Sequence, residues 1–174
     1  MNKEEIQKAL SGSYKSFTDF ISGLSEEEFM RAPQGKWIAG QHLDHLIRAV
    51  DPLAKGLLLP KFVVKLVFGK ANRASKSYDD LVKKYKTKLE AGGKAGGRFI
   101  PSVIPYAERK KKAEKLLMKV KRLNKNINGY SEPQLDAFIL PHPLLGKVTL
   151  REMMYFTIYH AEHHQHLVKK YSKE

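Results

Sequence analysis

The chain has 174 residues, of which 42% are hydrophobic and 29% are charged, so it is long enough for one domain with a buried core and too apolar for a disordered segment. The absence of cysteine excludes disulfides, thiolate metal ligands and a cysteine nucleophile, which leaves imidazole, carboxylate or water to bind any metal. Lysine and arginine number 32 against 18 acidic residues, and this formal charge of +14 raises the question of contact with polyanions.

Apolar residues recur at helical spacing in the N-terminal segment. They predict a first helix over residues 3–22, which Gly23 ends. Ser25 and Glu28 then have the spacing of a capping box, in which each side chain accepts a hydrogen bond from the backbone of the other residue. A short helical turn is therefore expected to begin there and to end near Pro33. The recurring apolar positions are Ile6, Leu10, Tyr14, Phe17 and Ile21.

Trp37 leads into a second predicted helix, which reaches about residue 57. Pro52 lies inside it and is expected to kink it, because proline cannot donate the backbone hydrogen bond of a helix interior. One ridge of this helix carries His42 and His45. The adjacent ridge is apolar and consists of Leu43, Ile47, Val50 and Leu53.

Residues 60–105 show no regular pattern apart from one segment. Ser77 caps a short amphipathic helix that extends to Glu90 and is closed by Gly92-Gly93. The tract AGGKAGGRFIP, which contains four glycines and a proline, is predicted to be a loop. This irregular, partly helical insertion is too short for a second domain, so residues 1–174 are predicted to form one domain.

The third long helix is predicted over residues 106–127, which carry a continuous apolar stripe, and it ends at Asn128-Gly129. A polar stretch and an extended loop, PHPLLGKVT, follow it. Thr149 and Glu152 form a second capping box at the start of the last helix, which reaches about Tyr171. Because no segment has a convincing run of strands, the predicted fold class is all-α, a four-helix bundle.

Four of the seven histidines lie in the C-terminal segment YHAEHHQHLV. His160 and His164 are four residues apart, so on a helix their rings project from one face and can meet a single ion. This face continues the buried ridge of the helix and is predicted to point into the bundle. His163 flanks that face, and His166 points away from it.

A third ligand is needed, because zinc-like ions bind tightly only with at least three protein ligands. The facing second helix offers His42 and His45. Three histidines with an open coordination position are typical of a catalytic site rather than a structural one. The alternative is that these histidines are satisfied core residues or part of a solvated helix surface.

Two stretches of the chain resemble the DinB-like superfamily, which includes YfiT-like metal-dependent hydrolases and thiol-dependent transferases. The first is GKWIAGQHLDHLIRA, in which Trp37 opens the second helix and His45 follows eight residues later. The second is HPLLGKVTLREMMYFTIYHAEHHQHLV, in which an HP-x-x-G-x-x-T pattern precedes a helix with His160 and His164. The resemblance covers nearly the whole chain and is weakest in residues 60–105.

The resemblance implies an up-down-down-up four-helix bundle, often dimeric, with one divalent metal ion near one end. Carried over residue by residue, it makes His45, His160 and His164 the ligands and leaves His42 outside the first coordination sphere. Imidazole suits several metals, and zinc or nickel is expected first, with iron as a further candidate. Where the family commonly has an Arg-Gly-Gln-type sequence after the last histidine, this chain has Gln165-His166-Leu167, so its pocket differs.

The resemblance implies two activities on a small molecule. One is hydrolysis by a metal-activated water, and the other is transfer to a low-molecular-weight thiol held as thiolate. Asp44 and Glu162 neighbour ligands in sequence and are expected to be solvated, and Trp37 is expected to pack at the entrance to its helix. The candidate pocket residues are His142, His163 and Gln165.

The densest basic tract is RKKKAEKLLMKVKRLNK, whose apolar residues form one stripe and whose lysines cover the rest. A solvated outer helix face explains it. The chain has no helix-turn-helix, zinc-finger or RNA-recognition signature, so specific nucleic-acid binding is not expected. The alternative to an enzyme is a non-catalytic bundle, a binding or stress-response module with nonspecific polyanion contact through this face.

The most apolar stretch, residues 52–68, is interrupted by Lys55, Lys61 and Lys65, which argues against a membrane span. The first ten residues, MNKEEIQKAL, have no apolar core of the kind found in secretory signals. Together with the lack of cysteine, these features predict a cytoplasmic protein.

Overall fold

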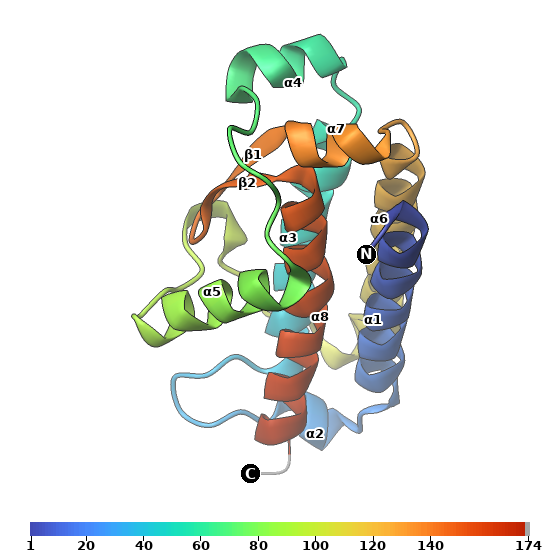
Figure 1. Cartoon of the computed structure of the whole chain (residues 1–174). Coiled ribbons are helices and arrows are strands. Elements are labelled where there is room, and N and C mark those ends of the chain that lie inside the picture. The colour runs from blue at the N-terminus through green and yellow to red at the C-terminus, as the bar shows by residue number, and fades with distance from the viewer. Residues whose placement is uncertain (173–174) are drawn as a thin grey trace.

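The structure, a computed structural model, describes residues 1–172. Four long helices dominate the described residues: α1 (Lys3–Gly23), α3 (Ala39–Gly56), α6 (Arg109–Ile127) and α8 (Leu150–Tyr171) (Figure 1). The predicted all-α four-helix bundle is therefore confirmed. No helix in residues 1–172 combines the length and the apolar character that crossing a bilayer requires.

Three contacts fix the directions of the four helices. The hydroxyl of Tyr106, just before α6, donates a hydrogen bond to the carbonyl of Leu24, just after α1, so these two helices are antiparallel. The last turns of α3 and α6 are joined by a hydrogen bond from Asn126, so this pair is parallel. The first turns of α1 and α8 meet where the N-terminal ammonium of Met1 donates to Tyr155. The order is up-down-down-up, as the resemblance implied.

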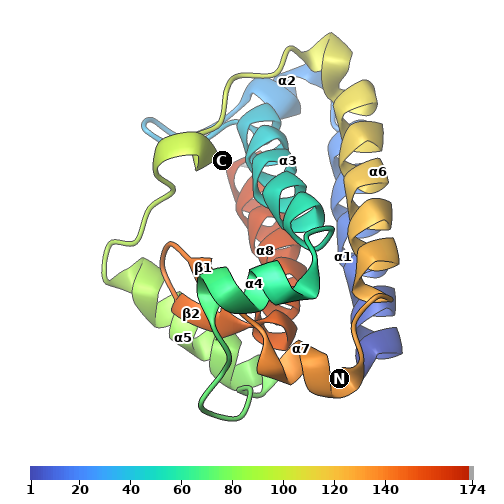
Figure 2. The same ribbon diagram turned by 90° about the horizontal axis from the view of Figure 1, so that it is seen from above.

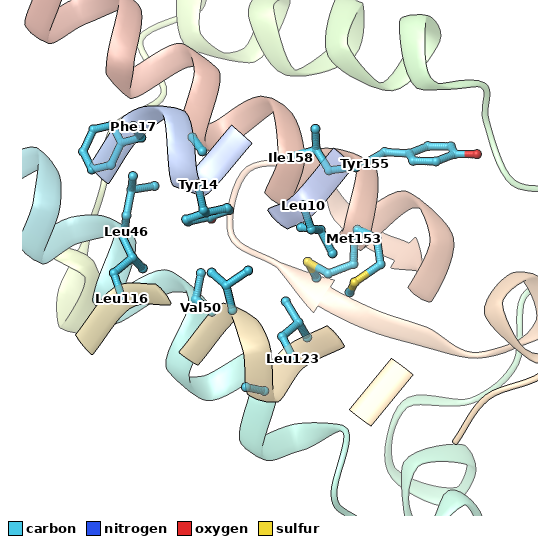
Figure 3. Close-up of a cluster of buried hydrophobic side chains, with 14 of the residues drawn as sticks. Leu10, Tyr14, Phe17, Leu46, Val50, Leu116, Leu123, Met153, Tyr155 and Ile158 are labelled. Carbon is cyan, nitrogen blue, oxygen red and sulfur yellow. The ribbon is translucent and has the colours of Figure 1, made fainter. Parts of the chain in front are cut away.

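The core lies where the apolar stripes of the four helices meet (Figure 3). Every apolar position predicted for α1 is fully buried. Burying one such side chain stabilises the fold by about 1.5–3 kcal/mol, so the stripes hold the bundle together. Side chains from all four helices are visible in the cluster, among them Leu10 and Phe17 of α1, Leu46 and Val50 of α3, Leu116 and Leu123 of α6, and Met153 and Ile158 of α8.

Capping boxes begin several helices, because the first backbone N–H groups of a helix need acceptors. The two predicted boxes are confirmed: Ser25 opens the short helix α2 (Glu26–Met30), and Thr149 opens α8. Asn2 and Glu5 form a further box at the start of α1. Helix α3 continues through Pro52 to its end at Gly56.

The insertion contains α4 (Lys61–Phe68), α5 (Tyr78–Glu90) and the 3-10 turn η1 (Gly97–Phe99), and a second 3-10 turn, η2 (Tyr106–Glu108), precedes α6. Helix α5 and its Ser77 cap are as predicted. Helix α4 was not predicted, because its sequence KFVVKLVF is rich in β-branched residues and apolar on more than one face. Figures 1 and 2 show that α5 and η1 lie beside α8 and α3, on the side away from α1 and α6, whereas α4 lies across one end of the bundle, near β1.

The segment before α8 corrects the sequence prediction. A short helix, α7 (Glu132–Ala137), precedes two antiparallel strands, β1 (Ile139–His142) and β2 (Gly146–Thr149). The predicted extended loop PHPLLGKVT is thus mostly a hairpin, and the expectation of no strands was wrong for these eight residues. The prolines obscured the pattern, yet a two-stranded sheet has only edge strands, where proline is tolerated.

Candidate metal centre

The three predicted ligands converge between α3 and α8. The Nε2 atoms of His45, on α3, and His160, on α8, are 3.1 Å apart. The Nε2 of His164, one turn further along α8, lies 2.9 Å from that of His160. All three side chains are buried, and one ligand atom from each lies within 4.8 Å of the others. The i,i+4 spacing on α8 produces this geometry, because it stacks the two rings on the face that meets α3.

Hydrogen bonds behind the rings fix which nitrogen faces the centre. His45 Nδ1 lies 2.7 Å from the carbonyl oxygen of Phe99, which can only accept, so Nδ1 carries the hydrogen. The Nε2 of neutral His45 therefore presents its lone pair to the other two histidines. His164 Nδ1 contacts Nδ1 of His42 at 2.7 Å, which similarly leaves its Nε2 toward the centre.

This donor set fits a divalent cation. Nitrogens that share a zinc ion at about 2.0–2.1 Å in a tetrahedral arrangement lie about 3.3 Å apart, close to the two separations from His160 Nε2 given above. The buried Nδ1 of His160 has no hydrogen-bond partner among residues 1–172, so no contact there competes for the orientation of the ring. A cation bound between the rings would be held by the lone pairs of His45 and His164 and, in the tautomer with its hydrogen on Nδ1, by that of His160.

Burial keeps these histidines neutral. It lowers the pKa of His160 and His164 well below the ordinary value of 6.5, and the neighbouring histidines lower both further. Burial also lowers the pKa of His45, and it lowers the pKa of His42 to about 3. Neutral imidazole is the form that binds metal, so the centre is ready for an ion at neutral pH without first releasing protons.

A cavity of about 700 Å³ lies against the three histidines. Its wall is mainly apolar, and its volume is in the range of small-molecule sites. The cavity is also lined by the exposed cations Lys36, Lys94 and Arg98, and no carboxylate is among the described residues that line it. A cavity with this lining is complementary to a small molecule that has an apolar body and neutral or negatively charged polar groups.

Two of the three predicted pocket residues line this cavity. His142 lies at the end of β1, and its Nδ1 accepts hydrogen bonds from the backbone N–H groups of Leu144 and Leu145, both at 3.1 Å. The neutral ring therefore carries its hydrogen on Nε2. Burial, with a smaller effect of Lys84, lowers the pKa of His142 to about 4. His163 lines the cavity as well, and burial lowers its pKa to about 4.

Gln165 lies elsewhere. Its side-chain amide is hydrogen-bonded to the hydroxyl of Ser16 on α1, at 3.1 Å, and it is not among the residues that line the cavity. Position 165 is on the side of α8 that packs against α1, so we do not retain it as a pocket residue. Asp44 was expected to be solvated, but its side chain is only 14% exposed and accepts hydrogen bonds from Arg48 Nε and Ser102 N. Glu162 is exposed, as expected.

Several residues at the site were not predicted. Trp37 does pack at the start of α3, but its ring lies against the histidines, with centroid distances of 5.1 Å to His45 and 5.5 Å to His42, and it lines the cavity. Tyr85 of α5 also lines the cavity, and its place on the buried face of a predicted helix was the available signal. The carbonyl of Phe99 gave no signal, since any residue of the glycine-rich loop supplies one.

We compared the sequence with models of protein families, and one model matches most of the chain. The model of the DinB superfamily matches residues 9–168, which include α3 and α6, most of α1 and α8, and the three converging histidines. No match was found among curated proteins. With the bundle and its histidine cluster described above, the match over residues 9–168 establishes that the chain belongs to the DinB superfamily.

Proposed function

We propose that this protein is a metal-dependent enzyme that acts on a small molecule, either as a hydrolase or as a thiol-dependent transferase. His45, His160 and His164 would hold one divalent ion, with zinc or nickel expected first and iron as a further candidate. The supporting observation is that three Nε2 atoms converge at the wall of a 700 Å³ cavity. Structural zinc sites are closed by a fourth protein ligand, whereas three histidines beside a cavity leave a position for a reactant.

A bound ion would act as a Lewis acid, activating a water for hydrolysis or a thiol for transfer. The remaining chemistry belongs to the cavity wall. The Nε2–H of His142 is a fixed donor for a substrate oxygen, because the hairpin backbone holds the opposite nitrogen. His163, held neutral by burial, has a ring nitrogen that can accept a hydrogen bond from a substrate O–H or N–H. The apolar wall limits access of bulk water, which strengthens polar interactions with the substrate.

A non-catalytic binding module, with nonspecific polyanion contact through α6, is the alternative. Lys119 of that helix pairs with Asp51, and Lys112 pairs with Glu108 at 3.3 Å, so part of the basic face is already neutralised. Nonspecific contact with polyanions also does not require a cavity beside neutral histidines. We retain a homodimer as a further proposal, which light scattering on the purified protein tests.

Elemental analysis of untagged protein tests the metal proposal. The parent should contain about one equivalent of metal, His160→Ala should lose it, and the exposed His166→Ala should retain it. Circular dichroism should show equal helix content in all three proteins. A full equivalent retained by His160→Ala would overturn the ligand assignment. Hydrolytic substrates are then tested with and without an added thiol, which separates the two reaction classes.

A further inference from the structure

Exposed apolar side chains gather at one end of the molecule, on and just before α4. We call Leu58, Leu59, Phe62, Leu66 and Val67 the α4 tip. They make up five of the ten large hydrophobic side chains that are exposed among the described residues. Leu66 is 83% exposed, Phe62 71% and Val67 63%. A group of large exposed apolar side chains of this kind often marks an interaction site, because exposing it to water is unfavourable.

The α4 tip is not needed to hold α4 in place. The inner side of the helix does that through Val64, which is buried, and Phe68, which packs against the core. Lys61 Nζ donates a hydrogen bond to Gln134 of α7 at 2.8 Å and lies over the ring of Tyr130. A bridge between Lys70 and Phe138 fixes the chain after the helix. The outward side chains are therefore free to contact another surface.

The charged residues that neighbour the α4 tip in the sequence all have one sign. Residues 52–78 contain six cations and no carboxylate. Lys55 pairs with Asp51 and Arg73 with Glu152, but the exposed Lys61, Lys65 and Lys70 form no ion pair within the described part of the chain. An apolar surface ringed by cations is complementary to an anionic lipid bilayer, which offers phosphates above an apolar interior.

We propose that the α4 tip docks on the surface of an anionic lipid bilayer, with Phe62 and Leu66 among the lipids and Lys65 and Lys70 near the phosphates. Figures 1 and 2 show that α4 lies at the outside of the molecule at its end of the bundle, where a flat surface can reach it. A second copy is a poorer occupant. A two-fold interface would bring the same uncompensated lysines of both copies together.

The α4 tip lies next to one end of the cavity, so docking on a bilayer would affect how a substrate reaches the cavity. Leu59 belongs to the α4 tip and also lines the cavity, as does Phe68 at the end of α4. Docking would therefore bring the apolar end of the cavity next to the bilayer. A substrate with an apolar body could then enter from the membrane, an extension that rests on the proposed function, whereas docking itself does not.

Binding to lipid vesicles tests the proposal. Vesicles of phosphatidylcholine, alone or mixed with phosphatidylglycerol, are sedimented with the parent, with Phe62→Glu/Leu66→Glu, and with Val103→Glu/Met118→Glu. The control pair lies away from α4 and is similarly exposed, at 60% and 65%, so both variants have the same net charge. We expect the parent to bind the anionic vesicles, the tip variant to bind about tenfold more weakly or less, and the control to stay within about twofold of the parent.

A fluorescence measurement locates the contact. Because the chain has no cysteine, Leu66→Cys and Met118→Cys each give a single site for an environment-sensitive dye. On anionic vesicles the emission should shift to shorter wavelength for the label at position 66 and not for the label at position 118. Unchanged emission at position 66 would overturn the proposal.

Three other results of these experiments would contradict docking on a lipid bilayer. Equal losses in the two glutamate variants would mean general adsorption of a basic protein, and a parent dimer that only the tip variant abolishes would mean that a second copy covers the tip. A parent that does not bind anionic vesicles refutes docking as well. Metal content, measured on the same samples, tests the proposed function separately, because the tip variant keeps all three histidines of the centre.

Discussion

His42 Nδ1 lies 2.7 Å from His164 Nδ1, behind the candidate metal centre. One of these nitrogens must carry a hydrogen for the contact to be favourable. If His164 binds an ion through Nε2, its Nδ1 is the donor and His42 is the acceptor. His42 is then a positioning residue that holds the ring of His164 in the correct tautomer and orientation, as residues behind metal ligands commonly do.

Replacing His42 with alanine should weaken metal binding about 10- to 100-fold without abolishing it, because the acceptor behind His164 is lost while the three ligands remain. Competition with a chromophoric chelator measures the affinity. His42→Gln should recover part of it, since its side-chain oxygen can also accept a hydrogen bond. An affinity unchanged in His42→Ala would contradict this role.

How far the site could be predicted differs from residue to residue. The spacing of His160 and His164 predicted their common face, because i,i+4 side chains stack on any regular helix. Spacing could not choose between His42 and His45, which share a ridge of α3. The choice depends on depth along the facing helix and on the carbonyl of Phe99, which contacts His45 from the insertion. Backbone acceptors in irregular loops leave no mark on a sequence.

The elements of the fold likewise divide into those that could be predicted from the sequence and those that could not. The bundle helices could be predicted because their apolar stripes and capping boxes are local signals. Helix α4 and the β-hairpin could not, because their local preferences are weak or contrary. Valines and prolines there are accommodated by tertiary contacts, such as the bridge from Lys70 to Phe138 and the hydrogen bonds to His142.

The stability of the metal-free protein should fall in acid partly through His142. Its folded-state pKa is about 4, below the ordinary 6.5, so its contribution is fully present above pH 6.5. As the pH falls from about 6.5 to 4, the unfolded chain takes up a proton that the folded chain excludes. In His142→Leu the side chain at this position cannot take up a proton in either state. The variant also leaves the backbone N–H groups of Leu144 and Leu145 without their acceptor.

Urea unfolding of the parent and of His142→Leu at a series of pH values measures the effect. The variant should be less stable by about 1–2 kcal/mol at pH 7.5, and the difference should shrink and then reverse as the pH falls toward 4, because the linked proton uptake outweighs the lost hydrogen bonds. A difference that does not change over this range would show that His142 keeps an ordinary pKa in the folded protein. Lys84, which also lowers the pKa, is retained in both proteins.

Arg73 should be important for stability, because its partner Glu152 is fully buried at the start of α8. The guanidinium donates two hydrogen bonds to this carboxylate, at 2.5 and 2.8 Å. Arg73→Met would leave a buried charge without its cation and should cost about 3–5 kcal/mol in the free energy of unfolding. Lys15→Met is the matched control, since it breaks an exposed pair with Asp19 and should cost less than about 1 kcal/mol.

The same pair predicts a pH effect. Burial raises the pKa of Glu152, but hydrogen bonds from Arg73 and from the backbone N–H groups of Lys76 and Thr149 outweigh it, so the net shift is downward. The stability from this carboxylate is therefore present above its unfolded pKa of about 4.3 and is lost as the pH falls through the lower, folded value. In Arg73→Met this loss should begin at higher pH. Equal acid midpoints for the two proteins would contradict the assignment.

Gly40 and Gly12 should respond in opposite directions to the same substitution. A Cβ on Gly40 would lie 2.9 Å from the carbonyl oxygen of Ile104 and 3.0 Å from the ring of Phe29, so Gly40→Ala forces the chain there apart and should cost about 1–3 kcal/mol. A Cβ on Gly12, exposed in the middle of α1, meets nothing within 4 Å, so Gly12→Ala should stabilise by about 0.5–1 kcal/mol. Urea unfolding measures both.

Gly40→Ala should also weaken metal binding, whereas Gly12→Ala should not. The segment that contains Ile104 is the one whose Phe99 carbonyl orients His45, and Gly40 begins the turn of α3 that leads to that histidine. Pushing this segment away from α3 lengthens the hydrogen bond to His45 Nδ1 and frees its ring. The chelator titration described for His42 measures the change. An alanine at position 40 that lowers stability but leaves the metal affinity unaltered would mean that the close packing at Gly40 and the orientation of His45 are independent.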